Sequence, residues 1–112
     1  MAKRGWERVR SLAAGLPGAE EGSSYGTPAF KVGGKLFARL HPEGDLVVRV
    51  DPDDRDLLCE GEPQHFQVTD HYRGYDMMLV RLDAIPKKRL AEVLEDSWRR
   101  VAGKRRLAER DG

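Results

Sequence analysis

Three apolar segments in the first half of the chain are joined by connections too short to cross over a sheet. Residues 29–32, 35–40 and 46–50 have the apolar and β-branched character expected of strands. Gly33-Gly34 joins the first pair, and Glu43-Gly44-Asp45 joins the second. Because parallel neighbours need a crossover of about a dozen residues or more, these segments are expected to pair antiparallel. An antiparallel meander is therefore the predicted centre of the fold.

Helical patterns flank this meander. A stripe formed by Trp6, Val9, Ala13 and Leu16 predicts a first helix over about 5–16, stopped by Pro17-Gly18. Further elements are predicted as a short helix from about 51 to 61 with a strong acidic start, strands over 66–69 and 77–82, and a last helix over 86–101. We therefore expect one α+β domain over 1–112, with a mainly antiparallel sheet, helices packed on one face and the order α-β-β-β-α-β-β-α. Residues 103–112 form a basic C-terminal tail.

The register of the first hairpin decides which side chains share the uncovered face. A three-residue loop with Gly34 left-handed pairs Lys31 with Lys35 and segregates polar from apolar residues better than a two-residue turn does. Phe30, Leu36, Ala38 and Leu40 then face the core. In this register the open face carries Lys31, Lys35, Arg39, Arg49 and Arg81 around Phe37.

Charge is distributed unevenly along a chain whose net charge is only +1. Residues 41–70 hold nine acidic and two basic side chains, whereas residues 98–110 hold six basic and one acidic. A small net charge argues against strong non-specific binding to polyanions. The asymmetry fits either a domain that orients on a polyanion or two solvated faces and a frayed tail.

No recognised catalytic, cofactor or metal motif is present in the sequence. There is no phosphate-binding glycine loop, no Cys-x-x-Cys pair and no His-Glu-x-x-His motif. Cys59 is the single cysteine, so no intramolecular disulfide forms, and its apolar neighbours indicate a core residue. His65 and His71 lack further ligands at zinc spacing. We expect no catalytic residues, no metal, no cofactor and no enzymatic activity.

Residues 69–75 concentrate aromatic and hydrogen-bonding side chains immediately before an apolar strand. His71, Arg73 and Tyr75 form a candidate site for a small ligand or an anion, through charge and aromatic stacking. The alternative is a well-satisfied turn that locks the last hairpin. The sequence leaves both open.

Short motifs spread over nearly the whole chain resemble the MmcQ/YjbR family. They are Leu16-Pro17-Gly18, Gly26-Thr27-Pro28-Ala29-Phe30-Lys31-Val32, Lys35-Leu36-Phe37-Ala38-Arg39-Leu40, Pro63, Phe66, Thr69, His71-Tyr72-Arg73-Gly74-Tyr75, Leu79-Val80-Arg81-Leu82 and Asp96-Ser97-Trp98. The chain departs from the pattern at Met77, where such sequences often have tryptophan. The resemblance implies a frataxin-like or double-wing fold and DNA binding, a function attributed to the family through similarity of fold. It brings no catalytic residues.

The sequence therefore predicts a non-enzymatic DNA-binding module with a basic open sheet face. Its candidate nucleic-acid-binding residues are Lys31, Lys35, Phe37, Arg39, Arg49, Arg81, Arg99, Arg100, Lys104 and Arg105. The alternative is a domain that binds another protein or a small ligand with the same face or the groove near His71 and Tyr75. With one cysteine, no leader-like segment and no long apolar run, we expect a cytoplasmic protein that does not bind membranes.

Overall fold

A computed structural model describes the backbone of residues 2–112 and the side chains of residues 5–112. The helices are α1 (Ala2–Ala13), α2 (Pro52–Gly61), α3 (Asp70–Arg73), α4 (Lys87–Val101) and α5 (Lys104–Asp111). The strands are β1 (Glu20–Ser24), β2 (Thr27–Val32), β3 (Lys35–Leu40), β4 (Leu46–Arg49), β5 (Phe66–Gln67) and β6 (Met77–Val80). The predicted α+β fold class is confirmed.

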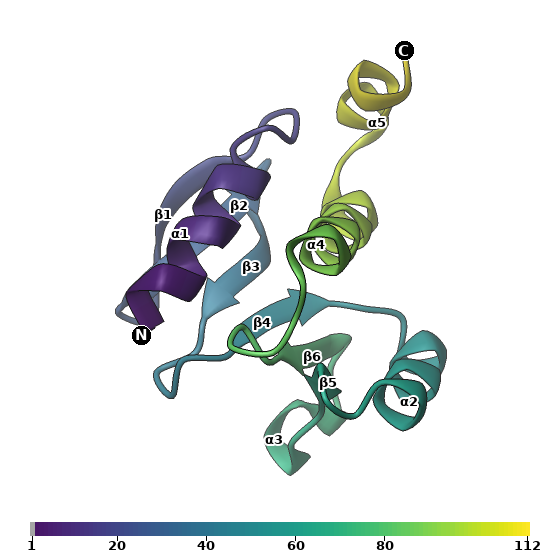
Figure 1. Cartoon of the computed structure of the whole chain (residues 1–112). Helices are drawn as coiled ribbons and strands as arrows, with labels where there is room; N and C mark the ends of the chain where they lie inside the picture. The colour runs from purple at the N-terminus through teal and green to yellow at the C-terminus, as the bar shows by residue number, and fades with distance from the viewer. Residues whose placement is uncertain (1) are drawn as a thin grey trace.

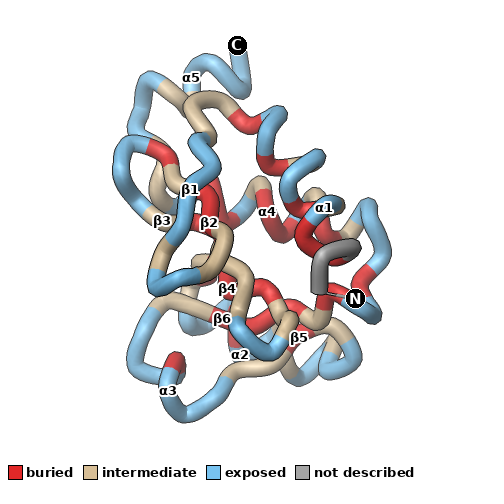
Figure 2. Tube along the Cα trace, turned by 90° about the vertical axis from the view of Figure 1, so that its left-hand side faces the viewer, coloured by how far each residue is buried: buried red, intermediate tan, exposed pale blue. Residues whose placement is uncertain are grey.

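The six strands form one sheet in the order β1-β2-β3-β4-β6-β5, with every neighbouring pair antiparallel. Helices α1 and α4 lie next to each other across one face of this sheet (Figure 1). Their apolar stripes meet the strands there, and Figure 2 shows buried residues alternating with exposed ones along both helices. The arrangement leaves the second face of the sheet without a long helix.

Packing on the helix-covered face is dense and aromatic. The rings of Trp6 and Phe30 lie 5.6 Å apart, and those of Phe30 and Phe37 lie 6.2 Å apart. The Trp98 indole donates from Nε1 to the Pro17 carbonyl at 3.0 Å, which satisfies the polar end of a fully buried ring. The Ser97 hydroxyl accepts from the backbone N–H of Arg49 and donates to the Phe37 carbonyl, tying α4 to two strands.

The Gly33-Gly34 hairpin has a different register from the predicted one. Both glycines have positive φ, 58° and 79°, which makes a tight two-residue turn, and Lys31 pairs with Leu36 rather than with Lys35. The register shifts at the next pair, because Phe30 pairs with Ala38 and Phe37 is left without a partner. The predicted three-residue loop with its bulge was therefore wrong, and a bulge that was not predicted lies in β3 at Phe37.

This bulge brings both Phe37 and Ala38 to the core side of the sheet. Phe37 is 1% exposed, so its prediction as an open-face aromatic was wrong. Burying the phenyl ring of Phe37 stabilises the fold more than strict segregation of polar from apolar positions would. The sheet therefore accommodates the register shift. Leu36 takes the open-face position next to Lys31. Lys35 pairs with the core-facing Val32, so its predicted open-face position was wrong, and it lies instead at the turn that borders this face.

Three elements were not predicted. Strand β1 is polar throughout and forms an edge of the sheet, so it lacks the apolar alternation that signals a strand. Helix α3 is a single turn on the second face, where Tyr72 forms a small buried cluster with Val47 and Leu79. The basic tail is largely the helix α5, which projects from the body of the molecule (Figure 1).

Candidate functional site

The second face of the sheet is called the open face here. Strand pairing places Lys31, Leu36, Arg39, Val47, Arg49, Met77 and Leu79 on it. Helix α3 covers only its β4–β6 end. The predicted cations Lys31, Arg39 and Arg49 are thus brought to one surface, while Phe37 is excluded from it.

The arginines of the open face are held by the protein's own acceptors. Arg39 donates from Nε to the Ser24 carbonyl at 3.2 Å and from Nη1 to the Tyr72 hydroxyl at 3.3 Å. Arg49 forms a 2.8 Å ion pair with Asp76 and donates to the Leu36 carbonyl at 3.0 Å. At the far edge, Arg81 donates to the Gln67 side chain at 3.0 Å. Rigid guanidinium forks suit such fixed bonding, and Arg49 has little left for a ligand, whereas Arg81 uses only its Nη2 group among the described residues.

The lysines of this region are free of such bonds. Lys31 is partly exposed and Lys35 is exposed, and neither has an ion pair among the residues that the structure describes. Both line a cavity of 500 Å³ whose other walls include Tyr25, Leu36 and Met77. Among the predicted cations near the open face, these two side chains are therefore the most available to an anion.

A pocket of 510 Å³ lies beside that cavity and shares three of its residues. Its lining residues are Tyr25, Leu36, Arg39, Val47, His71, Tyr72, Tyr75 and Met77. The His71 ring packs against Tyr72 at a centroid distance of 4.7 Å and against Tyr75 at 6.2 Å. His71 and Tyr75 of the predicted ligand site thus face one pocket. Arg73 does not line it, and pairs instead with Asp70 at 3.6 Å.

Tyr25 is the residue of this pocket that sequence reasoning missed. It lies on the two-residue turn between β1 and β2, and the residue is 89% exposed. The Arg39 guanidinium carbon is 5.3 Å from the centre of that ring, a cation–π distance. A signal was present in the sequence as Tyr25-Gly26, since a bulky residue before glycine in a tight turn is unusual.

A buried arginine supports the far wall of the pocket. Arg55 of α2 is 5% exposed, and its Nη1 and Nη2 atoms donate to the carbonyls of Tyr72, Arg73, Tyr75 and Met77 at 2.6–3.3 Å. These bonds satisfy carbonyl groups at the end of α3 and in the turn after it. Arg55 was not singled out from the sequence, where it is one basic residue in an acidic segment.

Most of the arginines near the C-terminus form ion pairs with carboxylates of the protein. Arg99 pairs with Glu95 at 2.9 Å and Asp111 at 2.6 Å, which raises its pKa above the ordinary value, and Arg110 also bonds Glu95. Arg100 reaches Asp51 at 3.7 Å and Asp76 at 3.5 Å. Lys104 and Arg105 lie exposed on α5, away from the open face (Figure 1). The predicted cations therefore do not form one continuous patch.

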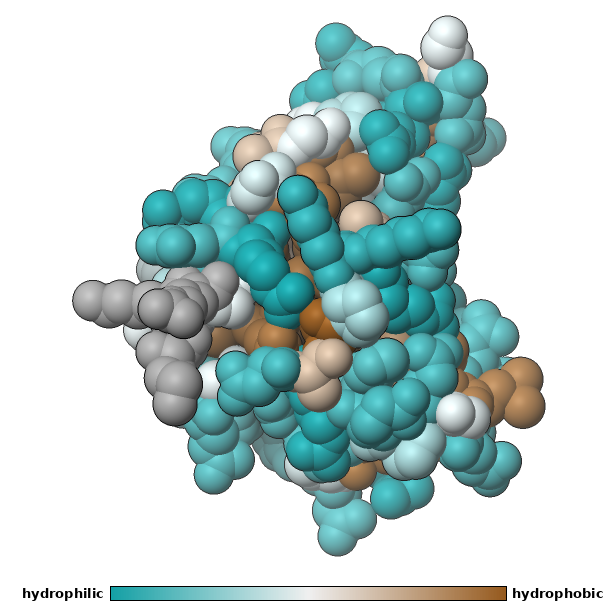
Figure 3. Space-filling view, viewed as in Figure 1, coloured by the Kyte–Doolittle hydropathy of each residue, from teal (hydrophilic) through white to brown (hydrophobic). Residues whose placement is uncertain are grey.

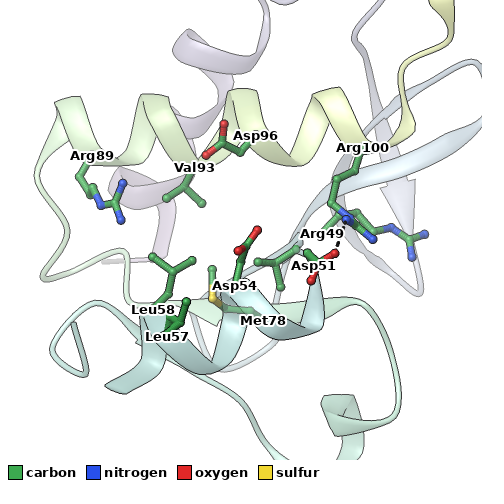
Figure 4. A pocket seen from close by; sticks show the side chains of 11 residues that line it. Arg49, Asp51, Asp54, Leu57, Leu58, Met78, Arg89, Val93, Asp96 and Arg100 are labelled. Carbon is green, nitrogen blue, oxygen red and sulfur yellow. Dashed lines mark ion pairs between the residues drawn. The ribbon is translucent and has the colours of Figure 1, made fainter. Parts of the chain in front are cut away.

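A second cleft, of 510 Å³, separates α2 from α4 (Figure 4). Leu57, Leu58 and Val93 give it apolar walls, and Asp54 and Asp96 face it without an ion pair in the described part of the chain. Burial and the nearby Glu95 carboxylate raise the pKa of Asp96. Leu57 is 69% exposed, and Figure 3 shows an apolar projection over α2 on an otherwise largely hydrophilic side. No arrangement of acid, base and nucleophile is assembled in this cleft.

Residues 5–112 also include candidate metal ligands and one cysteine. No group of three or more metal-ligating side chains comes together among them. Cys59 is partly buried, and this burial raises the pKa of its thiol, which disfavours the reactive thiolate. Within the described chain, no helix is both long enough and apolar enough to cross a bilayer.

Known proteins resemble this chain in both sequence and fold. The YjbR family model matches residues 14–100. The uncharacterized proteins Rv2570 of Mycobacterium tuberculosis and Mb2600 of Mycobacterium bovis are each 30% identical over 112 residues, covering 83% of this chain and 84% of theirs. The crystal structure of Deinococcus radiodurans protein DR2400, with family-model domain DUF419, superposes with a TM-score of 0.75 at 25% identity, covering 93% of this chain and 86% of that one. The chain belongs to the YjbR family, as its motifs predicted.

Proposed function

We propose that this protein is a nucleic-acid-binding module that uses the open face of its sheet and catalyses no reaction. The observation that carries the proposal is a track of three adjoining hollows, linked by shared lining residues, along that face. The first hollow, beside β1, is lined by Glu20 and Glu21 as well as by Lys31 and Gly34, and the last two residues also line the 500 Å³ cavity next to it. That cavity in turn shares Tyr25, Leu36 and Met77 with the tyrosine-lined pocket. An elongated track fits a chain molecule better than a compact one.

The side chains along the track suit a polyanion that carries flat rings. Lys31 and Lys35 are free to meet phosphates, and Arg39 keeps its Nη2 group without an acceptor among the described residues. Tyr25, His71 and Tyr75 supply aromatic surface. Cations combined with stacking rings are the general means of holding single strands and exposed bases. The DNA binding implied by the family resemblance points the same way.

The affinity is expected to be modest because few cations are available. The predicted register supplied five cations on the face and, with the C-terminal helix, a salt slope of about −4 to −6 on duplex DNA. Arg49, Arg99 and Arg100 are paired internally, Arg81 lies at the far edge of the sheet, and Lys104 and Arg105 lie on α5. About three phosphate contacts therefore remain, at Lys31, Lys35 and Arg39. The log–log slope of affinity against salt is then expected to be about −2 to −3.

A salt titration tests the proposal. Fluorescence anisotropy of labelled DNA is measured with the wild type, with Lys31→Glu/Lys35→Glu, and with the control Lys87→Glu/Lys88→Glu. The control makes the same charge change at exposed positions on α4, on the helix-covered side of the sheet. We expect the first variant to weaken binding about tenfold or more and the control to change it little. Equal weakening by both variants would indicate only non-specific attraction and would reject the open face.

A second function is favoured by one observation, the mostly apolar lining of the tyrosine-lined pocket. Leu36, Val47 and Met77 contribute to this lining, and apolar pockets with a few polar groups are typical of small-ligand sites. If the wild type binds no nucleic acid at low salt, this alternative replaces the first. A screen of flat aromatic compounds by thermal shift, repeated with Tyr75→Ala, then identifies the ligand class.

A further inference from the structure

The tyrosine-lined pocket displays aromatic side chains that the fold does not need. Among the described residues, three large apolar side chains stand out as exposed: Tyr25 at 89%, Leu57 at 69% and Tyr75 at 58%. Two of these three line the same pocket, although the chain positions are fifty residues apart. Exposed aromatic rings gathered at one hollow are typical of a binding site rather than of chance exposure.

Tyr25 is also kept in an unfavourable backbone conformation. Its φ of 53° makes it the one non-glycine residue with positive φ in the described chain. A tight turn of this kind favours asparagine, aspartate or glycine, because a β-carbon crowds the backbone in the left-handed region. Burial of the ring does not offset this strain, because the residue is exposed to solvent. Strain of this sort is typically retained where a side chain has a function.

The strained turn is fixed to the rest of the pocket through Arg39. The guanidinium lies under the Tyr25 ring and is anchored by the Ser24 carbonyl and the Tyr72 hydroxyl. His71 and Tyr75 supply the opposite aromatic residues, on a segment that Arg55 holds by four carbonyls. The pocket is therefore preorganised, with rings contributed from two separate parts of the chain and an apolar floor at Leu36.

We infer that this pocket holds one unpaired nucleobase of a single-stranded nucleic acid, with the neighbouring phosphates at Lys31 and Lys35. The inference rests on the proposed function and narrows it. A base has the flat π-surface that tyrosine and histidine rings stack on, and the adjacent cavity carries the free lysines that a phosphate needs. In a duplex each base is stacked and paired, so it reaches such a pocket only by being extruded, at a cost. The protein should therefore prefer single strands.

The test uses three fluorescent DNAs of equal length, about 12 nucleotides: an oligothymidylate, a strand of the same length with abasic sites throughout, and a duplex. Binding is measured at low salt for the wild type, Tyr25→Gly, Tyr75→Ala and the control Leu57→Ala. The control removes the other strongly exposed apolar side chain, which lies in the α2–α4 cleft. We expect oligothymidylate to bind about tenfold or more tightly than the other two DNAs.

The two tyrosine variants should weaken oligothymidylate binding about 5- to 100-fold, the range expected for loss of one stacked base, and leave binding to the abasic strand unchanged. Leu57→Ala should bind like the wild type. Tyr25→Gly should keep or raise the thermal midpoint, because glycine adopts positive φ without strain. That combination of unchanged stability and weakened binding would not arise from a purely structural ring.

Two results distinguish failure of the base pocket from failure of the proposed nucleic-acid binding. If Tyr25→Gly and Tyr75→Ala bind oligothymidylate like the wild type while Lys31→Glu/Lys35→Glu still weakens binding, the base pocket is rejected and the proposed function stands. Equal affinity of the wild type for oligothymidylate and the abasic strand rejects it too. If the wild type binds none of the three DNAs, both proposals fail. Should Tyr25→Gly lower the thermal midpoint steeply, Tyr75→Ala decides the question.

Discussion

The two faces of the sheet differ in how completely they are covered. Among the residues whose side chains the structure describes, twenty form one buried apolar cluster on the α1/α4 face, whereas the buried cluster of the open face consists of Val47, Tyr72 and Leu79 beneath α3. The rest of the open face is hollowed, with exposed rings and cations around the hollows. Stability therefore comes mainly from one side of the sheet, which leaves the other side free to bind.

The cations of the open face differ in the same way. Arg39 and Arg49 are bonded to backbone and side-chain acceptors, and Arg55 spans four carbonyls below the surface. Lys31, and Lys35 at the adjoining turn, have no such partners in the described chain. The arginines therefore stabilise the structure of this face, while the lysine ammonium groups are free to bind a ligand. Counting basic residues on a face thus overestimates the charge that a ligand meets.

The largest expected effect tests the assignment of residues to the two faces. Phe37→Ala should lower the free energy of unfolding by about 3–5 kcal/mol, because it removes a core phenyl ring and leaves a cavity. Leu36→Ala, one position away on the open face, should cost about 1 kcal/mol, since that side chain is only partly buried. Urea unfolding of both variants measures the difference. A smaller loss for Phe37→Ala than for Leu36→Ala would restore the register predicted from the sequence.

A smaller effect is expected from the arginine that holds the pocket wall. Arg55→Met should destabilise the protein by about 2–3 kcal/mol, because four carbonyls lose a charged donor while the apolar stem is kept. The control Arg73→Met removes an exposed ion pair with Asp70 on the same segment and should change stability by less than about 0.5 kcal/mol. Thermal and urea unfolding give both values. Equal losses in the two variants would contradict a buried structural role for Arg55.

The smallest effects concern two carboxylates on the helix side, and their signs are opposite. Hydrogen bonding from Arg89 lowers the pKa of Glu62 from 4.5, so its stabilisation is present above that value and is lost as the pH falls through the folded-state pKa. Partial desolvation beside the α2–α4 cleft raises the pKa of Asp96 from 3.8, so ionisation of this largely exposed carboxylate slightly opposes folding at neutral pH. Glu62→Gln should therefore lower stability at pH 7, and Asp96→Asn should raise it.

Each of these two changes should be below about 1 kcal/mol, because both side chains are partly solvated. Urea unfolding repeated from neutral to acidic pH should show both differences shrinking as the carboxylates become protonated. Two changes of the same sign at pH 7 would show that the surroundings of one carboxylate have been misassigned.

Much of the fold followed from local patterns because the strong elements are amphipathic. The stripes around Trp6 and Trp98 and the strands at Phe30 and Val48 each bury an apolar set, which produces a readable period. Strand β1 carries no apolar side chain to reveal it, and α3 is too short to show a period. The register depended on two left-handed glycines followed by a bulge, and pattern alone did not distinguish a bulge in the loop from one in the strand.

Only part of the candidate site could be predicted from the sequence. His71 and Tyr75 lie in one aromatic-rich segment, so local composition was enough to select them. Tyr25 joins them only because β1, β2, β3, β4 and β6 are neighbours in the sheet, a long-range arrangement that no short motif encodes. The loss of Arg49 as a free cation likewise depended on Asp76, a carboxylate 27 residues away in the chain.

Backbone amide chemical shifts during titration with oligothymidylate test most directly whether the open face is the binding surface. On isotope-labelled protein at low salt, the account predicts shifts that change around Tyr25, along residues 31–36 and over 71–77, with little change on the outer side of α4 or in α5. Changes concentrated in the α2–α4 cleft or on α5, with the open face unaffected, would contradict it.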